Sequence, residues 1–247
     1  MCKRERHIAL KDNAGETLGR PDAVSAALSR LEDYRRRIVA AAEQALSLWE
    51  VWAAFNEAKE LRQIIEYSPA SIAAVVYERA SLNSLVMVVV RLLDHPQRDR
   101  ITFSKVQEQM RIPGVSEALI AAAPSSLHTL IAQDVITPEQ ASTKIAARIT
   151  DFHARLERLA AEQPNRTKLL RDYRHANLAH ELWANKARIM PTYDQLKTMV
   201  FEILALAEDV QAIVTGSPLQ EPLTRGEASE SALELWRAVA AMFPVQK

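Results

Sequence analysis

The sequence is poor in cysteine, glycine and aromatic residues. It holds one cysteine, Cys2, and 5 glycines in 247 residues, and 6% of its residues are aromatic. A single cysteine forms no intrachain disulfide and no cysteine-based zinc site, which favours a reducing compartment. The chain also has no glycine-rich phosphate loop, no nucleophile elbow and no signature of paired catalytic carboxylates. These absences exclude several common enzyme classes.

Neither sign of charge is in excess. The chain has 31 basic and 31 acidic residues, so its formal net charge is +0. This balance argues against a nucleic-acid coat or a polybasic membrane surface, but it allows a local basic site. The most apolar window, residues 82–93, is about 12 residues long, whereas a membrane span needs about 20. Because the N-terminus also lacks the apolar run of a signal peptide, we expect a cytoplasmic protein without a membrane segment.

Helix-forming patterns run through nearly the whole chain. Apolar residues recur at spacings of three and four in long segments free of glycine and proline, and alternation of β-branched residues is scarce. The sequence therefore predicts an all-α protein. The connections between the long segments are short, which favours antiparallel neighbours in a helical bundle.

Prolines and capping residues divide the pattern into elements. Residues 21–67 predict one long helix or two joined near Asn56, and residues 68–94 predict a helix with Ser68 as its N-cap. Several prolines and a glycine favour short helices or loops over 96–136. The other helices are expected over 137–161, between Asn165 and Pro191, over 192–215, and over 231–243.

Two of these helices begin with a capping box, formed by Thr137 with Gln140 and by Thr192 with Gln195. From the elements we expect a flexible N-terminus over residues 1–20 and a helical domain over 21–216. A loop and a short helix are expected to follow over 217–247.

One segment concentrates polar side chains suited to phosphate chemistry. Residues 170–181 hold two arginines, two histidines and an asparagine within three turns. At about 100° per residue, Arg174, Asn177 and His180 share an arc of roughly 120°, and Arg171 lies next to it. An apolar stripe that should face the bundle or a partner also passes through His180. Its members are Leu169, Tyr173, Ala176, His180 and Trp183.

This placement predicts a chemistry for the segment. A histidine half-screened from water can exchange a proton near its ordinary pKa of about 6.5, and a neighbouring arginine can hold a phosphate. The combination suits RNA cleavage in which the 2′-hydroxyl attacks its own phosphate and no metal is required. One helix supplies one such histidine, so two helices across a two-fold axis would supply both proton transfers.

A family resemblance follows from the same residues. Arg174-His-Ala-Asn-Leu-Ala-His180 resembles the R-x(4 to 6)-H signature of the HEPN superfamily, and residues 170–180 resemble its abortive-infection AbiU-type branch. The apolar helix that ends at Asp94, together with residues 101–104, is similar to the helix preceding the motif in that branch. The resemblance covers roughly residues 70–215.

The resemblance implies an HEPN-like antiparallel helical bundle with additional N- and C-terminal helices, which dimerises through its motif helices. It implies a metal-independent RNA endonuclease without a cofactor, leaving 2′,3′-cyclic phosphate ends and serving antiphage abortive infection or acting as a toxin. RNA, a second copy of the chain and a cognate antitoxin are the partners it implies. It makes Arg174 the phosphate anchor and His180 the proton-transfer residue. Substrate contacts would come from Arg171, His175 and Asn177.

Other interpretations of these residues stay open. The arginines and histidines could bind RNA, a nucleotide or a partner protein without cleavage, or the chain could be a regulatory bundle with no nucleic-acid ligand. His180 could be a core-edge histidine bonded to Tyr173, and Tyr173 is expected to pack rather than to stack on a base. For Arg91, an ion pair with Asp94 one turn later is favoured over a phosphate contact. His175 and His180 lie about 140° apart on a helix and therefore cannot chelate one metal ion.

Overall fold

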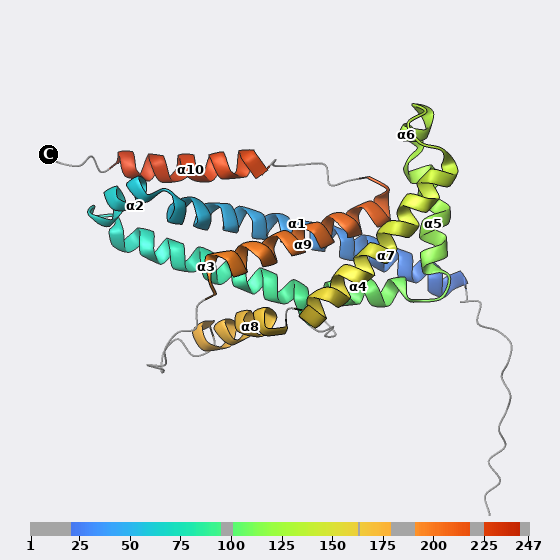
Figure 1. The fold of residues 1–247 in the computed structure, drawn as a ribbon, viewed down its shortest axis with the longest axis horizontal. Coiled ribbons are helices and arrows are strands. Elements are labelled where there is room, and N and C mark those ends of the chain that lie inside the picture. The colour runs from blue at the N-terminus through green and yellow to red at the C-terminus, as the bar shows by residue number, and fades with distance from the viewer. Residues whose placement is uncertain (1–20, 95–100, 163, 179–190, 218–224, 243–247) are drawn as a thin grey trace, which may run out of the picture.

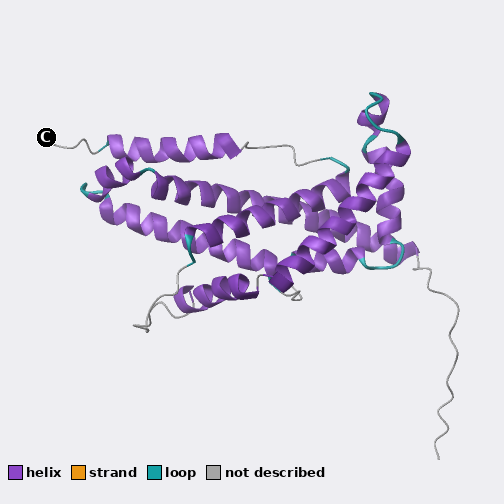
Figure 2. Ribbon diagram, viewed as in Figure 1, coloured by secondary structure: helices purple, strands orange, loops and turns teal. Residues whose placement is uncertain are grey.

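The structure, a computed structural model, describes residues 21–94, 101–162, 164–178, 191–217 and 225–242. Within these ranges the regular secondary structure is helical and no strand occurs, as Figure 2 shows. The prediction of an all-α protein is confirmed. The helices, in chain order, are α1 (Pro21–Glu57), α2 (Lys59–Glu66), α3 (Ser71–Leu93), α4 (Phe103–Met110), α5 (Val115–Ser126), α6 (His128–Ala132), α7 (Pro138–Glu162), α8 (Pro164–Leu178), α9 (Tyr193–Thr215) and α10 (Arg225–Ala241).

Helix α1 lies at the centre of the bundle. It packs against α3, α9 and α10 along its length, while α7 packs against α9 and α5 (Figure 1). Helices α1, α3, α7 and α9 contribute apolar stripes to the main core, and α10 packs on a second, smaller cluster with the end of α1, which is the expected use of three- and four-residue spacing. Among the buried side chains are Ile38 and Trp49 of α1, Leu85 and Val89 of α3, and Ile203 and Leu206 of α9.

Local capping signals set several helix ends as predicted. The Thr137 N–H donates to the Gln140 side chain at 2.8 Å, and the Gln140 N–H donates to the Thr137 hydroxyl at 3.2 Å. Thr192 and Gln195 form the second capping box at the start of α9. Helix α9 then ends at Gly216, whose φ of 71° places it in the left-handed region.

The junction near residue 58 agrees with one of the two predicted alternatives, whereas the junction near residue 68 differs from prediction. The long N-terminal segment is two helices that meet at Ala58, near Asn56. Ser68 lies three residues before α3: its hydroxyl donates to the Ile65 carbonyl at 2.7 Å and accepts from the Ala70 N–H at 3.1 Å, so it joins the end of α2 to the turn before α3. Helix α3 starts at Ser71 instead, with Ala70 as its N-cap.

Region 103–136 folds into the short helices α4, α5 and α6, as expected. Pro124, however, lies inside α5 rather than ending it. A proline has no N–H to donate to the carbonyl four residues earlier, here that of Ile120. The hydroxyl of Ser142 on α7 donates to this carbonyl at 3.2 Å, which satisfies it and ties α5 to α7.

The C-terminal helix packs on the bundle of its own chain. Helix α10 begins at Arg225, earlier than the predicted Ser231. Its Trp236 is 3% exposed and lies against Phe55, with ring centroids 4.5 Å apart. The indole N–H of Trp236 also donates to the Val51 carbonyl at 2.9 Å. This aromatic anchor joins α10 to α1.

Helix α3 has an unusual composition for a bundle helix. Among the described residues it alone is long and apolar enough to cross a membrane by length and composition, with a mean hydropathy of 1.4 over an 18-residue window. The sequence expectation considered only the most apolar window, residues 82–93, and did not average hydropathy over the whole helix. A core helix of a water-soluble protein meets the same criteria, so the finding is weak evidence for a span. In the bundle, α3 packs against α1 and buries residues such as Leu85 and Val86.

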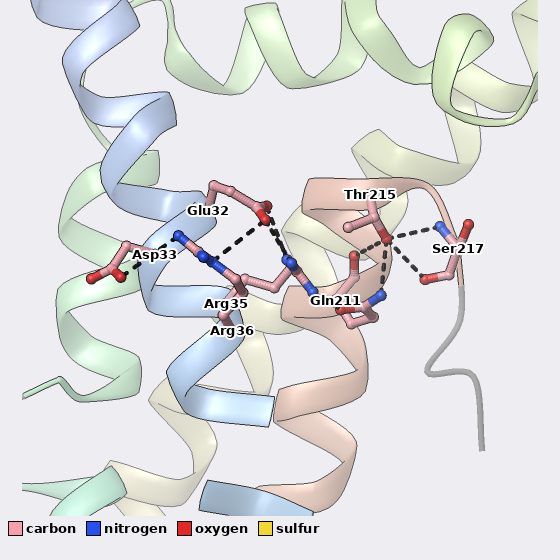
Figure 3. Close-up of polar contacts among 7 residues, drawn as sticks. All are labelled: Glu32, Asp33, Arg35, Arg36, Gln211, Thr215 and Ser217. Atoms are coloured by element: carbon pink, nitrogen blue, oxygen red, sulfur yellow. Dashed lines mark hydrogen bonds and ion pairs between the residues drawn. The ribbon is translucent and has the colours of Figure 1, made fainter. Parts of the chain in front are cut away.

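Polar side chains join α1 to the end of α9, although the residues involved lie far apart in the sequence. The Arg35 guanidinium holds Glu32 through two nitrogens, at 2.6 and 2.9 Å, and donates to the Gln211 side chain at 2.7 Å (Figure 3). Thr215 receives a hydrogen bond from the Gln211 amide at 3.2 Å. These contacts fix the two central helices in register.

Candidate functional site

Helix α8 carries the first part of the motif and packs against α3. It does so through two buried side chains, Leu170 at 1% and Tyr173 at 3% exposure. The Tyr173 hydroxyl donates to the side-chain oxygen of Asn83 on α3 at 2.8 Å. The prediction that Tyr173 is a packing residue is confirmed. Leu169 of the expected apolar stripe is only half-buried, and its neighbour Leu170 takes the core position.

Arg171 and Arg174 of α8 both bind Asp94, the residue that follows the last turn of α3. Arg171 Nε donates to Asp94 Oδ1 at 3.1 Å, and Arg174 Nη1 donates to Asp94 Oδ2 at 2.9 Å. The Asp94 side chain is 11% exposed, whereas those of Arg171 and Arg174 are 32% and 19% exposed. The predicted shared side of Arg171 and Arg174 is therefore real, because the two guanidinium groups converge on one carboxylate.

The end of α3 explains why arginines gather here. The C-terminus of a helix carries partial negative charge, so a carboxylate at that position needs nearby cations. Arg171 supplies a second contact by donating from Nη2 to the Leu93 carbonyl at 3.3 Å, which satisfies a carbonyl of the last turn. Two guanidinium groups face one carboxylate here. A partly exposed cluster of this kind is suited to a phosphate oxygen.

Asp94 was not predicted as a partner of α8. The sequence favoured Arg91, one turn earlier on the same helix, but the Arg91 side chain is exposed and Asp94 turns to Arg171 and Arg174. A local ion pair at a spacing of three is worth little in water, and two arginines on a packed helix offer better geometry. One feature of the sequence could have indicated this contact. Asp94 is an acidic residue at the C-terminal end of an apolar helix, where a negative charge is unfavourable unless cations lie nearby.

The remaining motif residues lie outside what the structure describes. His180 and Trp183 belong to residues 179–190, which are not described. His175 and Asn177 are part of α8, but their side chains are not described either. Their roles as proton-transfer residue and substrate contacts stay predictions.

Within the described residues, no group of three or more His, Cys, Asp and Glu side chains is arranged to hold a metal ion. Asp94, the acidic residue of the site, is paired with arginines, which compete with a cation for its oxygens. The chemistry that this arrangement can perform is therefore anion binding by guanidinium groups.

Comparisons with known proteins agree with the motif. The family model HEPN_AbiU2, described as AbiU2, matches residues 31–235, a span that includes Asp94, α8 and the whole Arg174–His180 segment. No curated protein and no solved structure gave a match.

Proposed function

Because the chain belongs to the AbiU2 family of HEPN proteins, we propose that it is an RNA endonuclease that works without a metal ion, in antiphage abortive infection or as a toxin. One observation carries the proposal: Arg174, the arginine of the motif, is held at 2.9 Å from Asp94 with Arg171 beside it. The two guanidinium groups form a partly exposed cationic cluster, and His180 follows Arg174 by six positions in the sequence. This cluster supports the proposal, because the reaction needs cations beside the phosphate.

The proposed reaction uses only side chains of the motif. Arg174 holds an oxygen of the scissile phosphate and stabilises the charge that grows on it. A neutral His180 takes the proton of the ribose 2′-hydroxyl, whose oxygen attacks the phosphorus. The bond from phosphorus to the 5′-oxygen breaks, and a protonated His180 of a second copy gives its proton to that oxygen. The products are a 2′,3′-cyclic phosphate and a 5′-hydroxyl.

A homodimer would bring the two histidines together. An exposed apolar face on α3, the helix against which α8 packs, supports a contact between two copies. Its residues Ile72, Val75 and Val76 are 78%, 46% and 62% exposed. Large exposed apolar patches on otherwise soluble folds mark interaction surfaces. We assign this α3 face, Ile72 with Val75 and Val76, to the contact between copies.

A second candidate function is a module that binds RNA, a nucleotide or a partner protein without cleavage. The two guanidinium groups held by Asp94 support it equally, because they can contact a phosphate whether or not a histidine acts on that phosphate. The two functions differ in their dependence on His180. Binding to phosphate needs the charge of Arg174 more than an imidazole.

The deciding experiment incubates purified protein with cellular RNA in excess EDTA and analyses the ends of the fragments. We expect cleavage with cyclic phosphate ends by the natural protein, loss of cleavage in His180→Ala and Arg174→Ala, and full activity in His128→Ala. His128 is an exposed histidine on α6 and serves as the matched control. Circular dichroism shows whether each variant keeps its helices.

Two results together would contradict the nuclease and favour the binding module. The natural protein would leave RNA intact, and both it and His180→Ala would bind RNA in a salt-sensitive way. Induced expression in a bacterial host tests the role as a toxin. Growth arrest by the natural chain but not by His180→Ala is the expected result, and relief by a co-expressed neighbouring protein would reveal an antitoxin.

A further inference from the structure

A cavity of about 350 Å³ lies beside Arg171, among the end of α3 and helices α4, α7 and α8. Small-molecule sites commonly enclose about 300 to 1,000 Å³, so this volume suits one small ligand. Leu93, Leu156 and Leu159 supply apolar lining, and Gln107 and Arg171 supply polar groups. The cavity therefore combines apolar contacts with hydrogen-bonding groups, and both are needed to hold a heterocycle.

Gln107 on α4 brings an unsatisfied donor to this cavity. Its side-chain Nε2 is buried and has no hydrogen-bond partner among the described residues. A buried amide without a partner costs free energy. If the Gln107 amide turns toward the cavity, an acceptor of the ligand satisfies the donor and recovers that cost. Glutamine amides read the edges of nucleobases, where acceptor and donor atoms alternate.

Arg171 and Glu157 give the cavity an electrostatic direction. Arg171 uses Nε and Nη2 for Asp94 and the Leu93 carbonyl, while its Nη1 makes no hydrogen bond with another described residue. Glu157 also lines the cavity, and its carboxylate accepts from Arg111 at 2.9 Å. A carboxylate in the lining disfavours an anion there, whereas the guanidinium of Arg171 attracts one. The uncharged base of a nucleotide therefore suits the cavity. Its phosphate suits the neighbouring position beside the guanidinium groups of Arg171 and Arg174.

We propose that this cavity binds a nucleobase whose phosphate lies against Arg171. The proposal extends the proposed function, because in an RNA substrate the bound base would be a neighbour of the scissile phosphate. The cavity would then select which base stands next to the cut. Apolar stacking and edge hydrogen bonds are the usual means of recognising unpaired RNA bases. The same chemistry would accept a free nucleotide.

The test separates base recognition from cleavage. Fluorescent 2′-O-methyl homopolymers of adenine, cytosine and uracil cannot be cut, because the attacking hydroxyl is blocked. Their affinities are measured for the natural protein, Gln107→Leu and Ala160→Phe. Ala160 lines the cavity and is exposed, so a larger ring narrows the cavity without entering the core. Ala154→Phe, at another exposed alanine of α7, is the matched control.

We expect the natural protein and Ala154→Phe to prefer one homopolymer by about fivefold or more, as a specific base contact provides. Both cavity variants should reduce that preference to less than about twofold, while the salt-dependent binding to the other homopolymers persists. The four nucleoside monophosphates form a second arm. Specific binding of one of them that the cavity variants abolish, without a preference among homopolymers, identifies a free nucleotide as the ligand.

The proposal is overturned if the natural protein discriminates among neither homopolymers nor monophosphates, or if discrimination survives both cavity variants. Its failure is distinct from failure of the nuclease. A base preference without cleavage of unmodified RNA contradicts only the nuclease, and cleavage without any base preference contradicts only the cavity.

Discussion

Arg174 of α8 and Asp94 at the end of α3 are joined by a hydrogen bond of 2.9 Å, although they lie 80 positions apart in the sequence. The bond connects the motif arginine to the core helix of the bundle, which fixes where its guanidinium can point. Arg171 shares the same carboxylate at 3.1 Å. Asp94 is thus a positioning residue, and its own substitution tests how far the site depends on it.

Replacing Asp94 by Asn should destabilise the fold. The change leaves two half-buried guanidinium groups without their charged acceptor, and hydrogen bonds to charged groups contribute about 1.5 to 3 kcal/mol. Urea unfolding of the variant is the measurement. The matched control is Asp172→Asn on α8, the helix of the two arginines, which breaks an exposed pair with Lys168 at 2.7 Å. Exposed pairs are worth less than about 1 kcal/mol, so equal losses in the two variants would contradict the structural role of Asp94.

A second prediction concerns the turn after α9. Gly216 has a φ of 71°, and a Cβ built there would lie 2.5 Å from the Ser126 Cβ. Gly216→Ala should therefore lower the free energy of unfolding by about 1 to 3 kcal/mol, through backbone strain and overpacking together.

Gly114→Ala separates the two causes of that loss. Gly114 also has a positive φ, 89°, but its added Cβ would meet only the end of the Val24 side chain, at 3.2 Å. We expect a smaller loss there, measured by the same urea unfolding. A loss at Gly114 as large as that at Gly216 would show that backbone strain alone decides both.

The sequence predicted the parts of this fold that depend on local interactions. Both capping boxes and the end of α9 were identified because each rests on residues within one turn of each other. The spacing of Arg171 and Arg174 likewise predicted a shared side. Their partner was not found, because Asp94 becomes their neighbour only when α8 packs on α3, and no pattern along either helix specifies that contact.

The same distinction applies to the cavity beside Arg171. Gln107 and Glu157 belong to α4 and α7, and neither stands out by sequence, since a glutamine or glutamate on a helix is usually a solvated side chain. The cavity exists because four helices meet around it. The proton-transfer role of His180, in contrast, comes from the motif and the family, and it awaits the cleavage experiment.

The α3 face formed by Ile72, Val75 and Val76 predicts the oligomeric state. Val76→Glu should leave the helix content unchanged, because Val76 is 62% exposed in the single chain, but should convert a dimer to a monomer by light scattering. Val135→Glu is the matched control, at a 61% exposed valine between α6 and α7. The prediction is contradicted if the natural protein is a monomer, or if Val135→Glu also dissociates the dimer.

The final prediction concerns pH and the acidic residues of α9. Asp209 lies between Arg148 and Arg155 of α7, each at 3.4 Å, and its side chain is 10% exposed. Burial raises the pKa of the Asp209 carboxyl, and the attraction of Arg155 and Arg148 opposes the rise without cancelling it. The folded chain therefore holds this proton more tightly than the unfolded chain does.

It follows that Asp209 contributes less to stability as pH rises through the window that starts near its unfolded pKa, about 3.9, and ends at its raised folded pKa. Asp209→Asn removes this titration, so the melting temperature of the natural protein minus that of the variant should fall between pH 4 and pH 7. Glu32→Gln should show the opposite pH dependence, because the hydrogen bond from Arg35 lowers the pKa of Glu32. The melting temperature of the natural protein minus that of Glu32→Gln should grow as pH rises through the range in which carboxylates ionise. A difference for Asp209→Asn that also grows with pH would mean that the arginines outweigh burial, and that the ionised carboxylate stabilises the contact between α7 and α9.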